Sequence, residues 1–328
     1  MNMNKYAIVT GVSSGIGECI ADCFIENLSL LRKEFIFESE SSYLAGALLY
    51  AQNNSHIDIK HIKECYNILK KNTGVFSDYR TIGLHLILEM SLAKNPTQYF
   101  ENIKYVYESL KKSDFFGSYY KIIASLLICD NNREKDIENI ISRYQYMHNK
   151  MKETHPLLTG EDDIPFNVLL AMTDDDMDKL VDKSEACYQL MKKRFSNKDE
   201  LQSLGQIFAL LDKSAEESCE KFIELADKLK EKKRKIDSQF LSVFGTLLFI
   251  DKDIDKLIDD ILVVDQYLGS KKGNGYWIGN KVVRLACATS LVEIHYGCDK
   301  SKKFTSIFVA AIRQQIATMI ATDVILFS

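Results

Sequence analysis

The sequence predicts an all-α protein, and three observations support this fold class. From Leu30 onward, apolar residues recur at spacings of three and four, the periodicity of helices that bury one face. The 328 residues include only 3 prolines and 15 glycines, too few for the many turns of a β-sandwich. Residues that start or stop helices separate the apolar stretches. We expect a multi-helix bundle or an α-solenoid-like array of helix pairs, preceded by a short strand-turn-helix appendage.

The capping residues place the helices in order along the chain. Asn72-Thr-Gly74 ends one helix, Asn95-Pro96 begins another, and Asn197 marks a later break. Thr159 and Thr173 are the predicted N-caps of the two helices that follow the centre of the chain. We expect helices near residues 44–51, 59–72, 78–92, 96–111, 115–130, 133–152, 161–172, 174–196, 200–211, 212–235, 239–250, 252–268, 282–294 and 307–326.

Composition indicates a soluble protein. Apolar residues make up 46% of the chain and charged residues 27%, with a net charge of −4. We therefore expect no nucleic-acid partner. The first apolar run is too short for a signal peptide, and Arg313 interrupts residues 304–327, the one membrane candidate. The 8 cysteines form no C-x-x-C pair and indicate buried thiols in a reducing compartment. We expect a cytoplasmic protein that does not span a membrane.

A central break divides the chain. The segment His155–Pro165 holds two of the three prolines, and proline interrupts a continuous helix. We predict an N-terminal helical half at residues 29–154 and a C-terminal helical half at residues 155–328. Residues 1–28 form a separate N-terminal segment in this prediction.

The N-terminal segment carries a glycine motif. Lys5–Gly17 is typical of a short strand, a glycine turn and a helix start, with Gly11, Gly15 and Gly17 placed to approach a pyrophosphate. Residues 5–27 resemble the opening of the short-chain dehydrogenases/reductases. This resemblance implies an NAD(P)-dependent oxidoreductase, with the pair Tyr146/Lys150 as proton donor and helper.

The rest of that family's pattern is missing from the chain. Tyr-x-x-x-Lys occurs six times, no Asn-Asn-Ala-Gly follows, and Arg133 occupies the position of the expected serine. We therefore interpret residues 1–28 as a vestigial start and keep the nucleotide-binding enzyme as the alternative.

The helical body resembles a second family, a bacterial domain of unknown function numbered 4003. The resemblance rests on Leu48-Leu-Tyr-Ala51, on Asn72–Arg80 and above all on His155-Pro-Leu-Leu-Thr-Gly-Glu-Asp-Asp163. It covers residues 29–328. It implies an architecture and no chemistry.

Two groups of acidic residues are candidate metal ligands. His148, His155, Asp162 and Asp163 offer imidazole and carboxylate ligands, but the acids also suit the first turn of a helix, where the dipole favours anions. The segment Asp174–Asp178 has the acid spacing of a calcium loop, yet its sixth position is Lys179 instead of glycine. Helix capping explains both groups without a metal.

Two segments carry clustered basic or glycine residues. Lys230–Lys235 has five basic residues in six, typical of a solvated helix end. The loop Gly269–Gly275 could hold a phosphate but lacks the spacing of a phosphate-binding loop, so a connector is the simpler interpretation.

These observations predict a non-catalytic platform that binds a protein or small molecule in a groove between helix pairs. No catalytic residue is assigned and no cofactor is expected. The NAD(P) enzyme is the first alternative, and a metal protein using His155–Asp163 is the second.

Overall fold

The computed structural model describes residues 16–36, 38–75, 77–114, 118–156, 158–271 and 279–297. Within these ranges the chain is helical and contains no strand, which confirms the all-α prediction. The predicted N-terminal strand and turn lie outside the described residues, as does the closing segment 304–327. No helix in the described ranges has the length and apolar character needed to cross a bilayer.

The elements follow in chain order. They are α2 (Ile16–Glu34), α3 (Glu40–Gln52), α4 (Ile59–Asn72), α5 (Asp78–Thr81), α6 (Gly83–Leu92), α7 (Pro96–Asp114), α8 (Tyr119–Asp130), η1 (Glu134–Asp136), α9 (Ile137–Thr154), η2 (Glu161–Asp163), α10 (Ile164–Ala171), α11 (Met177–Met191), α12 (Lys198–Ala209), α13 (Ala215–Glu231), α14 (Leu241–Gly245), η3 (Thr246–Phe249), α15 (Ile254–Ser270) and α17 (Lys281–Gly297).

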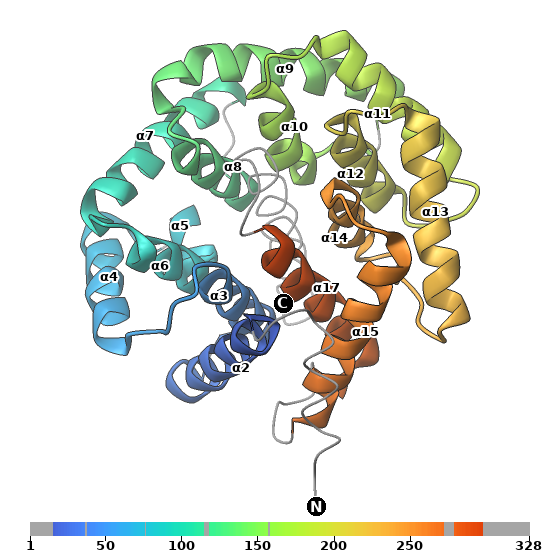
Figure 1. Ribbon diagram of the computed structural model, residues 1–328. Coiled ribbons are helices and arrows are strands. Elements are labelled where there is room, and N and C mark those ends of the chain that lie inside the picture. The colour runs from blue at the N-terminus through green and yellow to red at the C-terminus, as the bar shows by residue number, and fades with distance from the viewer. Residues whose placement is uncertain are drawn as a thin grey trace, which may run out of the picture.

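These helices form a ring of pairs (Figure 1). Each pair has one outer and one inner helix, and the pairs are α2/α3, α4/α6, α7/α8, α9/α10, α11/α12, α13/α14 and α15/α17. Most inner helices contact the next inner helix, and most outer helices contact the next outer one. The chain is therefore a helix-pair array, the second of the two predicted architectures, and the array closes on itself.

The first and last pairs close the ring. Helix α17 packs against both α2 and α3. On the outside, Asp22 of α2 accepts a hydrogen bond from Tyr267 and pairs with Lys271 at 3.1 Å, at the end of α15. Residues 245 and 249 positions apart in the sequence thus share one contact.

The predicted break at the centre of the chain does not separate the two helices beside it. Helices α9 and α10 pack against each other across the 155–163 connection, and α2 runs through residue 28 without interruption. The division into separate halves stays a prediction.

Local capping explains most helix boundaries. The side chain of Asn95 accepts a hydrogen bond from the Gln98 N–H in the first turn of α7, and Asn197 caps α12. Ser214 and Glu217 form a capping box at the start of α13. The two predicted threonine caps are wrong. Gly160 precedes η2 in place of Thr159, and Asp176 in place of Thr173 caps α11, because its carboxylate reaches the Lys179 N–H at 3.0 Å.

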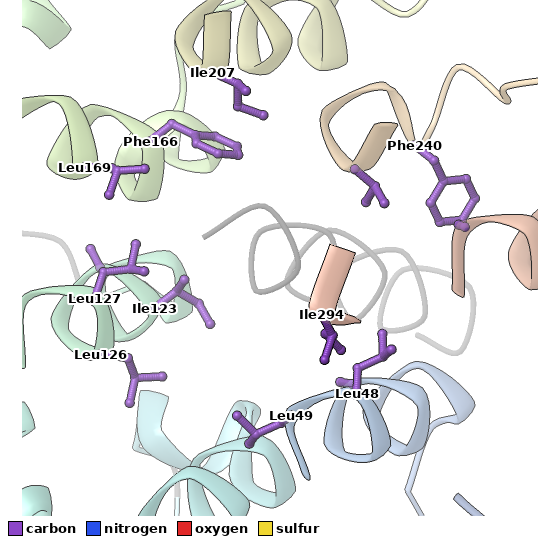
Figure 2. Packing of buried hydrophobic residues seen from close by; sticks show 14 of the residues in the cluster. Leu48, Leu49, Ile123, Leu126, Leu127, Phe166, Leu169, Ile207, Phe240 and Ile294 are labelled. Carbon is purple, nitrogen blue, oxygen red and sulfur yellow. The ribbon is translucent and has the colours of Figure 1, made fainter. Parts of the chain in front are cut away.

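The inner helices carry the core. Apolar side chains from α3, α8, α10, α12 and α17 point toward the middle of the ring (Figure 2), and they include Leu48, Leu49, Ile123, Leu126, Leu127, Phe166, Leu169, Ile207 and Ile294. Inner helices α8 and α10 are buried around almost their whole circumference. This explains their nearly continuous apolar sequence, since a helix that is apolar on every side is a buried one.

Candidate functional site

The central motif lies where α9 passes into α10. The His155 Nε2 is 2.6 Å from Oε2 of Glu185 on α11, and its ring lies against Tyr188, with centroids 4.6 Å apart. A cavity of about 20 Å³, the size of roughly one water molecule, adjoins these side chains and Gln202. The Gln202 amide donates to Thr159 Oγ1 at 3.2 Å, while its Oε1 has no hydrogen-bond partner within the described ranges.

Carboxylates in and near this motif accept hydrogen bonds from backbone N–H groups. Buried Asp163 accepts a hydrogen bond from the Gly160 N–H at 3.0 Å, and burial raises its pKa well above the usual range. Burial also raises the pKa of Asp162. Glu200, at the start of α12, accepts hydrogen bonds from the N–H and hydroxyl of Ser242 at the start of α14, and burial raises its pKa to about 7. The contact between Asp163 and the Gly160 N–H favours the capping interpretation of this acid.

The candidate metal ligands are not gathered around one point. His148 lies against Tyr144 on α9, His155 pairs with Glu185, and Asp163 binds the backbone. Within the described residues, no group of three or more His, Cys, Asp or Glu side chains could hold a metal ion. Asp176 of the calcium-like segment caps α11.

The pair Tyr146/Lys150 has a structural partner. Both side chains donate to Oδ1 of Asp178 on the next outer helix, α11. Tyr267 and Lys271 make the same arrangement with Asp22. Two of the six Tyr-x-x-x-Lys pairs therefore join neighbouring outer helices. Gly17 lies in the first turn of α2, and Gly11 and Gly15 lie outside the described residues.

The structure brings together the basic run and the glycine loop that the sequence left apart. A pocket of about 510 Å³ lies between α13, α15 and α17. Lys232 and Arg234 line it from the basic run. Gly269 and Ser270, which the sequence placed in the loop, line it as the last residues of α15. We call this cavity the basic pocket. Its lining has three cationic side chains, Lys232, Arg234 and Arg284, against one carboxylate, Asp265.

A buried carboxylate holds the two arginines in place. Asp265 is 0% exposed and accepts hydrogen bonds from Arg234 Nε at 3.0 Å and Nη2 at 2.8 Å. Its other oxygen accepts a bond from Arg284 Nε at 2.7 Å. We call these three residues the Asp265 bridge; it ties together α15, α17 and the residues that follow α13. A Cβ on Gly269 would lie 3.1 Å from the Arg284 guanidinium carbon, so the absence of a side chain there leaves room for this arginine.

Sequence reasoning missed Asp265 and Arg284. Asp265 sits in the apolar run Ile261-Leu-Val-Val-Asp265 and Arg284 in Val282-Val-Arg-Leu285. A charged residue within an apolar helical stretch was the available signal, because such residues are rarely buried without a partner.

The fold defines an all-α protein of helix pairs arranged in a closed ring. The chain belongs to the family described as "Protein of unknown function (DUF4003)", whose model matches residues 27–324. This match confirms the resemblance inferred for the helical body, and almost all of the dehydrogenase-like motif precedes it. No curated protein and no solved structure matches the chain.

Proposed function

We propose that this protein is a non-catalytic binding platform and that the basic pocket receives a phosphate-bearing small molecule. The observation that carries the proposal is the Asp265 bridge. It fixes two guanidinium groups beside a cavity of about 510 Å³, a size common for small-molecule sites.

Charge and geometry support an anionic ligand. Asp265 neutralises only one of the three cations that line the pocket. Arg234 uses Nε and Nη2 on Asp265 and donates from Nη1 to the Lys233 carbonyl oxygen at a long 3.4 Å, so it has donors to spare. A guanidinium that is already oriented loses little freedom when it binds phosphate, and its planar donors match phosphate oxygens.

Calorimetric titration with inorganic pyrophosphate at low ionic strength tests the proposal. We expect saturable binding that weakens at least tenfold in Lys232→Gln combined with Arg234→Gln. Lys232→Gln alone, which leaves the Asp265 bridge complete, should weaken binding about threefold. Lys230→Gln is the matched control, because Lys230 belongs to the same basic run but does not line the pocket.

Two outcomes would contradict the proposal. One is the absence of binding at millimolar pyrophosphate, and the other is an equal loss in Lys230→Gln and Lys232→Gln, which would indicate only diffuse attraction to the basic run. A parallel titration with NADPH addresses the oxidoreductase alternative. NADPH binding that survives the Lys232/Arg234 change but is lost in Gly15→Val would favour the glycine turn as the ligand site.

A further inference from the structure

A second pocket lies where α12 ends and where α13 and α15 begin. Its volume is about 380 Å³. One wall is apolar and is formed by Leu211, Leu247, Leu248, Phe249, Ile250 and Ile254, among others. The charged part of the lining has three lysines, Lys213, Lys221 and Lys252, against two aspartates, Asp212 and Asp251. Lys213 immediately precedes the Ser214 cap, and Lys221 lies on α13. The pocket is thus amphipathic, with an apolar wall and a charged part in which cations outnumber carboxylates by one.

The two lysines lie against each other. The contact between their amino groups is the largest cause that lowers the pKa of Lys213, followed by burial. Glu217 and Asp251 are the acids near enough to act in the opposite direction. Glu217 is engaged in the capping box, where its carboxylate accepts the Ser214 N–H at 3.1 Å. Asp251 lines the pocket together with Asp212, but the nearest charged neighbour of Lys213 in its effect on the pKa is Lys221, so two like charges lie side by side in the pocket.

We propose that this pocket binds a fatty-acid-type ligand, an unbranched aliphatic chain that ends in a single carboxylate. The carboxylate lies between Lys213 and Lys221, where it offsets their mutual repulsion. The chain lies along Leu248, Phe249 and Ile254, which are partly exposed and lose water contact on binding. The apolar wall distinguishes this site from the basic pocket, whose lining includes one apolar side chain, Leu262. The two sites share no lining residue.

Calorimetric titration of the full chain with decanoate, below its micelle concentration, tests this site. We expect binding that weakens from decanoate to octanoate to hexanoate by about fourfold for each methylene that leaves the wall. Lys213→Gln combined with Lys221→Gln should weaken decanoate binding at least tenfold. The matched control is Lys60→Gln, an exposed lysine on α4, and it should bind as the parent does.

The ligand series separates charge from chain. Decanol and decyltrimethylammonium should bind at least tenfold more weakly than decanoate, because neither carries the carboxylate. Equal binding of decanoate by the parent and by the double lysine variant would overturn the proposal, as would equal binding of acetate and decanoate. A variant with Lys232→Gln and Arg234→Gln should still bind decanoate. The proposal for this pocket is therefore tested independently of the proposal for the basic pocket.

Discussion

Asp265 and Glu200 are both buried carboxylates, and the fold accommodates them in opposite ways. Asp265 is 0% exposed and contacts two guanidinium groups. Glu200 is 7% exposed, and its hydrogen bonds come from Ser242 at the start of a neighbouring inner helix. The first arrangement leaves positive charge beside a pocket. In the second, burial raises the pKa of Glu200 to about 7, although the hydrogen bonds from Ser242 act in the opposite direction. The comparison shows that a buried carboxylate indicates a binding site only where the cationic side chains paired with it also line a pocket.

Removal of the Asp265 carboxylate should give the largest effect on stability. Asp265→Asn leaves two guanidinium groups without their shared acceptor, and breaking a buried ion pair in this way costs about 3 kcal/mol or more. Urea unfolding followed by circular dichroism measures the loss. Asp259→Asn is the control, since Asp259 is exposed and 3.9 Å from Lys232, and exposed pairs contribute roughly 0–1 kcal/mol. Equal losses in the two variants would remove the special role given to the Asp265 bridge.

Glu200 should instead make stability depend on pH. Its folded pKa of about 7 exceeds the ordinary 4.5, so the folded state keeps a proton that the unfolded state releases between these values. The stabilisation is therefore complete below the unfolded pKa and is lost as pH rises through the folded one, by roughly 3 kcal/mol.

Glu200→Gln cannot lose that proton, and unfolding free energies measured from pH 4.5 to 8 should fall less steeply in this variant. Asp163 and Glu293, whose pKa values burial also raises, keep part of the slope. The exposed Glu231→Gln should follow the parent. A slope unchanged by Glu200→Gln would show that Glu200 ionises in the fold at its ordinary pKa.

The smallest effect is expected at the carboxylates on the outside of the ring. Asp22 and Asp178 each bind a tyrosine and a lysine from a neighbouring outer helix, but water reaches both. Asp22→Asn should lower the unfolding free energy by about 1 kcal/mol, the usual contribution of such hydrogen bonds. Asp178→Asn should lower the unfolding free energy by less. Asp178 joins two neighbouring helix pairs that also pack against each other elsewhere, whereas Asp22 joins the first and last helix pairs of the ring. Thermal unfolding compares the two variants, and a larger loss in Asp178→Asn would contradict this account of ring closure.

Much of the local structure could be predicted from sequence, and the errors have identifiable causes. Pro96 lies at the start of α7 as predicted, and the predicted break at Asn197 is where α12 begins. Glu224 and Lys228 have the four-residue spacing of a helical ion pair and form one at 3.0 Å. Glu217 and Lys221 have the same four-residue spacing, but the Glu217 carboxylate binds the Ser214 N–H instead, because a capping contact three residues away competes with a surface ion pair. Thr159 is not the cap because Gly160 takes the N-cap position of η2, and the Thr159 hydroxyl accepts a hydrogen bond from Gln202 on α12.

The candidate sites were less predictable. The basic run and the glycine loop were both recognised, but each had an adequate explanation as a solvated helix end or a connector. Their meeting depends on Arg234 and Asp265, 31 positions apart, and on Arg284, 19 positions further along. No local pattern records such a contact.

The sequence by itself determined that the chain is helical and where most helices begin and end. These properties follow from interactions within three or four residues and from apolar periodicity, both of which are written in the local order of residues. Only the tertiary structure decided that the pairs close into a ring, that Asp265 receives two arginines and that Glu200 receives none. The burial and the partners of these carboxylates come from helices that are distant in sequence. Burial and partners together decide how stable the ionised form of each carboxylate is.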